Sequence, residues 1–167
     1  MWAFLAGGLC LAQPHPSAPN QQPSAPPPEG AVLGALHQDN LTEIRVTAAA
    51  KAQAQAPDVK AFAERAERDH RAIDLKVRAL SARLGLKFVN DSPPDPEVDR
   101  MLALRGAAFD PAFVEFMARR HLREIDRLEH QQQQLPKESP VADLLAHVLP
   151  KLREHYQSAS RLGGSPQ

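Results

Sequence analysis

Three histidines, His70, His121 and His155, occupy positions where the apolar repeat of a helix calls for a hydrophobic side chain. They belong to three separate helical patterns, and Glu43 lies beside the apolar positions of a fourth. Neutral imidazole nitrogens together with one carboxylate form a donor set that zinc, copper, iron or manganese accepts. The sequence therefore predicts a site for a single transition metal at Glu43, His70, His121 and His155.

Two acidic residues beside His70 in the sequence are suited to support such a site. Asp69 and Glu67 are near enough to orient an imidazole by accepting its second N–H, and Glu67 could serve as an extra ligand instead. A glycine-rich phosphate loop, Gly-x-Ser-x-Gly and His-Glu-x-x-His are all absent from the sequence. We therefore assign no catalytic residue, and binding or storage is a better interpretation than turnover.

Other interpretations of the same residues stay open. Hydrogen-bonded His and Glu side chains could set the register of packed helices without a metal, which would make the chain a structural or protein-interaction module. Core histidines with no common purpose are another alternative. A metal-dependent redox enzyme is the weakest of the alternatives, because no acid–base pair or nucleophile stands out beside the histidines.

The elements that must position these residues are helices. Strand patterns of alternating β-branched residues are absent from the sequence. Asp110-Pro111 and Ser139-Pro140 pair a capping side chain with a proline at the first helical position, and Gly85 and Pro136 mark helix ends. The sequence predicts an all-α, ferritin-like four-helix bundle with a short extra helix (96–105) in the long 85–109 connection; the long helices cover about 31–56, 58–84, 110–135 and 140–162.

The depth of the four residues along these helices bears on the topology. If the helices run alternately up and down, all four residues lie roughly 20–22 Å from the same end, at about 1.5 Å per residue. If the 85–109 connection instead spans the bundle, His155 falls roughly 9 Å from that layer. A shared site therefore favours the direct, up-and-down topology. The predicted apolar face of the first helix consists of Leu33, His37, Leu41, Ile44 and Ala48.

The ends of the chain predict export. The apolar run of residues 2–12 resembles the core of a signal peptide, although no Lys or Arg precedes it, and its removal would take away Cys10, the only cysteine. Residues 13–30 contain seven of the sixteen prolines and are interpreted as a disordered linker. The folded domain then covers 31–162, residues 163–167 form a disordered tail, and we expect a periplasmic or envelope-associated protein.

Composition limits the partners. The 167 residues are enough for one domain, and 20 basic against 20 acidic side chains argue against nucleic-acid binding. No run of eighteen apolar residues predicts a membrane-spanning helix, and an unknown protein partner is compatible with the sequence. The charged run that includes Arg119, Arg120, Arg123, Glu124 and Arg127 is typical of a solvated helix face.

Short motifs spread over residues 31–162 resemble, in the same order, the bacterial domain-of-unknown-function 4142 family. These motifs are Val59-Lys60-x-Phe62-Ala63, Asp69-His70, Phe109-Asp110-x-x-Phe113, Met117-x-x-x-His121 and Leu149-Pro150-x-Leu152-x-x-His155. The resemblance implies an exported, ferritin-like four-helix protein of unassigned activity, and Phe113 stands where the family commonly has tyrosine. Di-iron bundles use two Glu-x-x-His pairs, and only Glu67-x-x-His70 fits here, so a mononuclear, histidine-rich site is favoured.

Overall fold

The structure, a computed structural model, describes residues 28–88 and 95–164, and within these ranges every regular element is a helix. The predicted all-α class is confirmed, and the predicted bounds agree with the observed ones to within three residues. The predicted leader and nearly all of the linker lie outside the described residues. The helices are α1 (Glu29–Gln53), α2 (Pro57–Arg83), α3 (Pro96–Ala103), the short 3₁₀ helix η1 (Gly106–Ala108), α4 (Phe109–Gln134) and α5 (Pro140–Leu162).

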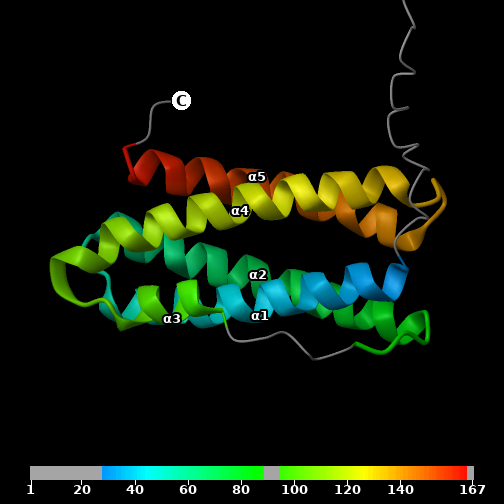
Figure 1. The fold of residues 1–167 in the computed structure, drawn as a ribbon, viewed down its shortest axis with the longest axis horizontal. Coiled ribbons are helices and arrows are strands. Elements are labelled where there is room, and N and C mark those ends of the chain that lie inside the picture. The colour runs from blue at the N-terminus through cyan, green and yellow to red at the C-terminus, as the bar shows by residue number, and fades with distance from the viewer. Residues whose placement is uncertain (1–27, 89–94, 165–167) are drawn as a thin grey trace, which may run out of the picture.

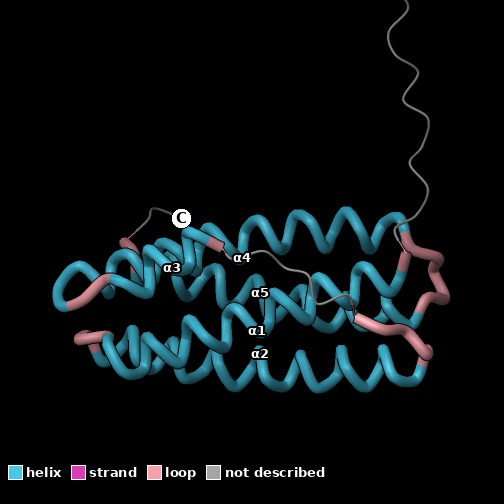
Figure 2. The backbone as a smooth tube through the Cα atoms, turned by 60° about the horizontal axis from the view of Figure 1, so that its bottom comes forward, coloured by secondary structure: helices cyan, strands magenta, loops and turns pink. Residues whose placement is uncertain are grey.

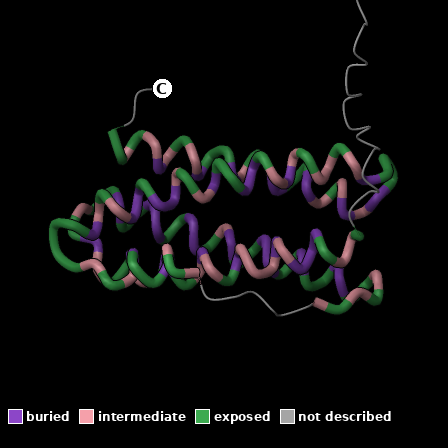
Figure 3. The backbone as a smooth tube through the Cα atoms, viewed as in Figure 1, coloured by how far each residue is buried: buried purple, intermediate pink, exposed green. Residues whose placement is uncertain are grey.

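The four long helices pack as two pairs, α1 along α2 and α4 along α5, with α2 also against α5 (Figures 1 and 2). Their buried stripes face one another (Figure 3). The core consists of two apolar clusters, one containing Phe62, Phe113 and Met117 and the other containing Leu128 and Leu152. The polar candidate residues lie along the helices between the members of these two clusters. Among the described helices, none has the combined length and apolarity that crossing a membrane requires.

The expected up-and-down topology is wrong. Helices α1 and α4 run antiparallel, because Arg127 of α4 pairs with Asp39 early in α1, whereas Asp110 accepts hydrogen bonds from the backbone N–H groups of Gln55 and Ala56 just past the end of α1. Since α2 reverses the direction of α1, α2 and α4 run parallel (Figure 1). The end of α2 and the start of α4 therefore lie at opposite ends of the molecule.

The candidate residues still share one layer, because α5 stops short of the end at which α4 begins. A Cβ atom built on Gly163, the residue after α5, would lie 3.6 Å from Val114 Cγ2, five residues into α4. His121 is seven residues after Val114, and His155 is eight residues before Gly163. The two histidines therefore lie at nearly equal depth. The expected 9 Å displacement assumed that all helices end in one plane, and that assumption is what fails.

The predicted buried face of α1 is also wrong in its centre. Leu41 is 43% exposed, Ile44 is half-buried and Ala48 is exposed. The face that the helix buries instead includes three polar side chains and reads Leu36, Asn40, Glu43, Thr47 and Ala50. Two of these polar groups are satisfied locally, since Asn40 Nδ2 donates to the carbonyl of Leu36 and the Thr47 hydroxyl donates to that of Glu43. Three of the five side chains that α1 packs against the other helices are polar. The buried face of α1 is therefore recognised by the helical spacing of its residues and not by their hydrophobicity.

Candidate metal centre

Glu43, His70, His121 and His155 meet in the core, each from a different long helix, and each is at most 1% exposed. The Nε2 atom of His121 lies 3.3 Å from Nε2 of His70 and 3.3 Å from Nδ1 of His155. One nitrogen from each ring lies within 4.8 Å of the others, and Glu43 Oε2 is 2.5 Å from His70 Nε2 and 3.6 Å from His121 Nε2. The structure thus brings together all four residues that the sequence singled out.

The protonated nitrogen of His70 is fixed by its neighbour on α1. The amide of Asn40 donates from Nδ2 to the carbonyl of Leu36 over 2.7 Å, and this leaves its Oδ1 facing His70 Nδ1 at 2.9 Å. An amide oxygen can only accept, so His70 Nδ1 carries the hydrogen. The lone pair of the neutral ring is therefore on Nε2, the atom that faces the other histidines.

The remaining two rings follow the same rule. His121 Nδ1 lies 2.8 Å from the backbone carbonyl of Met117, and His155 Nε2 lies 2.9 Å from Asp69 Oδ2. A carbonyl and a carboxylate are acceptors, so each of these nitrogens donates its hydrogen outward. The lone pairs of His121 Nε2 and His155 Nδ1 then point inward. Metal-binding histidines characteristically donate their second N–H in this way, which fixes both the tautomer and the ring orientation.

The electrostatics keep this donor set ready at neutral pH. Burial lowers the pKa of His121, and burial together with the neighbouring His70 and His121 lowers the pKa of His155 to about 4. Burial alone would raise the pKa of Glu43, but His121, His70 and Arg120 together hold it well below its usual range. The centre therefore combines an anionic carboxylate with at least two neutral imidazoles.

The convergence is costly without a cation. Among the described residues, neither buried oxygen of Glu43 has a hydrogen-bond partner of acceptable geometry. A second proton on His70, bound to Nε2, would give Glu43 a hydrogen-bond donor. His121 Nε2 and His155 Nδ1 would still face each other with one lone pair each. Buried acceptors without a donor cost free energy, whereas a metal ion accepts the lone pairs of several of them at once.

The two acidic residues expected to support the site are placed differently. Asp69 contacts His155 as expected of a residue that orients an imidazole. Glu67 instead pairs with Lys51 and Arg71, each at 2.7 Å, and none of its described contacts involves a histidine. Its expected role as an extra ligand therefore finds no support in the geometry.

The sequence analysis missed three polar residues around the centre: Asn40, Arg120 and Glu124. The charged run on α4 is not a uniformly solvated face, because Glu124 is only 5% exposed and the Arg120 side chain only 14%. Asn40 precedes Glu43 by three residues and Glu124 follows His121 by three, so each shares a helix face with a predicted ligand. That spacing is the signal that could have identified both residues.

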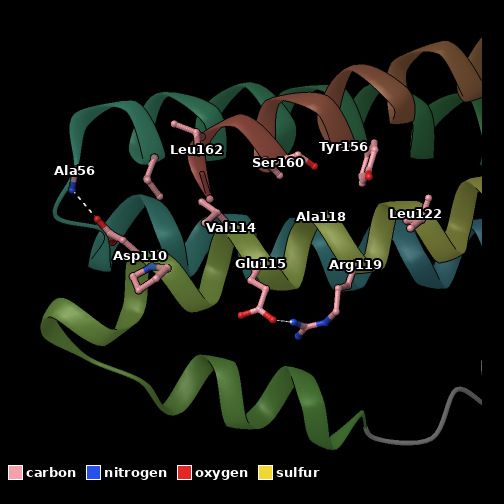
Figure 4. A pocket seen from close by; sticks show the side chains of 14 residues that line it. Ala56, Asp110, Val114, Glu115, Ala118, Arg119, Leu122, Tyr156, Ser160 and Leu162 are labelled. Atoms are coloured by element: carbon pink, nitrogen blue, oxygen red, sulfur yellow. Dashed lines mark hydrogen bonds and ion pairs between the residues drawn. The ribbon is translucent and has the colours of Figure 1, made fainter. Parts of the chain in front are cut away.

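A groove of about 650 Å³ lies elsewhere, between α4 and the C-terminal part of α5 (Figure 4). Its charged groups are engaged with one another or with the backbone: Glu115 pairs with Arg119, and Asp110 accepts from Ala56 N. No cluster of ligand atoms lies in its lining among the described residues. The chemistry of the molecule is therefore concentrated in the histidine layer.

Comparisons with known proteins cover most of the chain. The model of a family described as "Domain of unknown function (DUF4142)" matches residues 14–162, which confirms the resemblance drawn from the motifs. The chain is also similar to a crystal structure of a DUF305 fragment from Deinococcus radiodurans, with a TM-score of 0.74 and 17% sequence identity over 85% of this chain and 99% of that one. That likeness concerns the fold alone. No curated protein matches the sequence.

Proposed function

The chain belongs to the DUF4142 family, and we propose that it is a metal-binding protein that holds one transition-metal ion through Glu43, His70, His121 and His155. The observation that carries this proposal is the convergence of three imidazole nitrogens within 4.8 Å, each ring donating its other N–H outward. Nitrogen donors with one carboxylate suit zinc, copper, iron and manganese. Binding, storage or buffering of the metal is the activity that this arrangement supports best.

We further infer a ferritin-like four-helix bundle that is exported to the periplasm or envelope. The pairing of α1 with α2 and of α4 with α5 supports the bundle, because such folds build metal sites from side chains on facing helices. The apolar run of residues 2–12 and the proline-rich stretch that follows it support export. Detection of the chain in a periplasmic fraction, with its first residues removed, would test this inference.

Metal loading is the direct test of the proposal. We expect purified protein, dialysed against zinc and then washed free of excess, to retain one ion per chain by elemental analysis. At free zinc a hundred times the Kd, mass action adds about 2.7 kcal/mol to stability, which for a domain of this size raises the melting temperature by roughly 10 °C. His147→Leu is the matched control, because His147 is an exposed histidine of α5 and should change neither result. A chain that retains no metal and shows no shift would refute the proposal.

Asp69 offers a finer test, since it touches His155 but lies outside the cluster of four. We expect Asp69→Ala to weaken zinc binding by roughly tenfold to a hundredfold, because the imidazole loses the acceptor that orients it. Glu67→Gln is the control, since Glu67 lies two residues earlier and pairs with Lys51 and Arg71. Competition with a chromophoric chelator measures both affinities. Equal affinities for the two variants would mean that Asp69 plays no part in the site.

A structural layer without metal is the second candidate function, and the 2.5 Å contact between Glu43 Oε2 and His70 Nε2 favours it. In that case His70 is protonated and the buried ion pair fixes the register of α1 against α2. The loading experiment decides between the two, because a purely structural layer takes up no zinc.

A further inference from the structure

The Nε2 atom of His121 lies at similar distances from the other three donor atoms of the histidine layer. It is 3.3 Å from His70 Nε2, 3.3 Å from His155 Nδ1 and 3.6 Å from Glu43 Oε2. A tetrahedral ion with bonds of about 2.0–2.1 Å separates every pair of its donors by about 3.3–3.4 Å. A square-planar or octahedral ion with the same bonds places neighbouring donors about 2.9 Å apart and opposite donors about 4.1 Å apart. The three distances from His121 therefore match the tetrahedral arrangement.

Two other separations in the layer adjust when an ion binds. Glu43 Oε2 is 2.5 Å from His70 Nε2, and one nitrogen each of His70 and His155 lie within 4.8 Å of each other. Since the side chain of Glu43 has three rotatable bonds, its carboxylate can draw back by the roughly 0.8 Å that a tetrahedral separation requires. Small tilts of the rings about the hydrogen bonds that hold them adjust the remaining pair.

Each ring is held from outside by an acceptor. Asn40, which faces His70, also donates a hydrogen bond to the backbone of α1 and is thereby fixed itself. The acceptor for His121 is a backbone carbonyl of its own helix, and the acceptor for His155 is the carboxylate of Asp69. An ion that needs a different arrangement of donors can rotate the rings only by breaking these bonds. The layer should therefore discriminate between ions by their preferred geometry.

Apolar side chains close the layer above and below, along the helix axes. On α2, α4 and α5 one buried apolar residue lies about a turn before the histidine and another about a turn after it: Ala66 and Ile73, Met117 and Ile125, Leu152 and Ala159. Phe62 adds its ring at a right angle to that of His155, with the centroids 6.4 Å apart. A buried water needs about two to four polar partners, and these side chains offer none. An ion in the layer therefore depends on its protein ligands.

We propose that the layer selects ions that accept four donors in a tetrahedral arrangement, and that zinc(II) is the ion it holds. The inference rests on the proposed function, because it concerns the ion bound by Glu43 and the three histidines. It narrows that function from four metals to one geometric class, and it disfavours manganese(II) and nickel(II), which prefer octahedral or square-planar surroundings. The hydrogen bonds that hold the three rings are the source of this selectivity.

Cobalt(II) and nickel(II) provide the test, because most nitrogen and oxygen sites bind nickel(II) more tightly than cobalt(II). Zinc uptake is measured first, so that a chain that takes up no zinc counts against the proposed function. We expect cobalt(II), which accepts tetrahedral coordination readily, to bind at least roughly tenfold more tightly than nickel(II) in competition with a chromophoric chelator. A chain that binds zinc but prefers nickel(II) to cobalt(II) would overturn the inference while the metal site stands.

The visible spectrum of the cobalt(II)-loaded protein reports the geometry independently of affinity. Tetrahedral cobalt(II) has no centre of inversion and therefore absorbs visible light much more strongly than six-coordinate cobalt(II). We expect an intense absorption from protein that elemental analysis shows to hold one cobalt ion per chain. A fully loaded protein that absorbs as weakly as cobalt(II) in water would contradict tetrahedral coordination.

Asn40 lies outside the four ligands and tests the source of the selectivity. We expect Asn40→Leu to reduce the preference for cobalt(II) over nickel(II) at least roughly threefold, because His70 loses the acceptor that holds its ring. Thr47→Val is the matched control, since Thr47 is buried on the same face of α1 and donates to the backbone carbonyl of Glu43. Both variants should take up one zinc ion, which shows that they are folded. The two ions carry the same charge, so general effects on affinity cancel in their ratio, and equal ratios for the two variants would mean that ring orientation does not select the ion.

Discussion

Replacing His121 by leucine should weaken metal binding roughly a hundredfold and leave the metal-free fold about as stable as the wild type or more stable. His121 is the central residue of the layer, since its Nε2 lies 3.3 Å from both other rings. Leucine matches the apolar residues that precede and follow it in the α4 repeat, Met117 and Leu128. Exchange of a buried polar group for a packed apolar one is often neutral or stabilising by about 1–4 kcal/mol.

The choice of His121 over His70 matters for the metal-free protein. Removal of one partner of a buried ion pair strands the other charge, which typically costs about 3–5 kcal/mol. Glu43 keeps His70 at 2.5 Å and Arg120 at 3.5 Å when His121 is replaced, so its charge is not stranded. We therefore expect the metal-free free energy of unfolding to stay within about 1 kcal/mol of the wild type or to rise.

The loss of metal affinity should be large by comparison. Apparent binding energies of four-ligand zinc sites are about 10–16 kcal/mol, so one ligand accounts for about 3 kcal/mol and roughly a hundredfold in Kd. Urea unfolding with chelator, and zinc competition without it, measure the two quantities separately. His147→Leu again provides the control. A variant that is strongly destabilised without metal and binds zinc as tightly as the wild type would assign His121 to the structure and not to a metal site.

The histidine layer was predictable because three imidazoles interrupt otherwise apolar repeats, and position within a repeat determines burial. On α2, α4 and α5 the residues flanking each histidine are hydrophobic, as in Ala66 and Ile73 around His70, so the buried face is unambiguous. On α1 the same logic failed. Asn40 and Thr47 take core positions there, while Leu41 faces solvent, so hydrophobicity alone selected the wrong face.

The topology and the burial of Arg120 and Glu124 could not be predicted, and for different reasons. The direction of α4 relative to α2 depends on contacts distant in sequence, such as that of Asp110 with the backbone at Gln55 and Ala56, and no local pattern encodes it. Arg120 and Glu124 belong to a run of alternating charges that is typical of a solvated helix. Only the packing of α1 against α4 shows that Arg120 and Glu124 are turned inward.

Acidification should destabilise the metal-free protein, and His155 should be a principal cause. Burial beside His70 and His121 lowers the pKa of folded His155 to about 4, whereas the unfolded value is near 6.5. As the pH falls below 6.5, the unfolded chain therefore binds a proton that the folded chain excludes, and unfolding becomes easier until the pH passes 4. At 1.36 kcal/mol per pKa unit, the loss attributable to His155 is about 3 kcal/mol.

Other groups titrate over the same range, so the experiment compares two proteins. The lowered pKa of His121 acts in the same direction as that of His155, and so does that of Glu43 below about 4.5. The raised pKa of Glu124 acts in the opposite direction, because its folded form retains a proton that the unfolded chain loses above about 4.5. The difference in the free energy of unfolding between the wild type and His155→Leu largely cancels these shared contributions. We expect this difference, measured by urea unfolding with chelator, to shift by about 3 kcal/mol against the wild type between pH 7 and pH 4. A difference that stays constant over this range would show that His155 titrates normally in the folded protein.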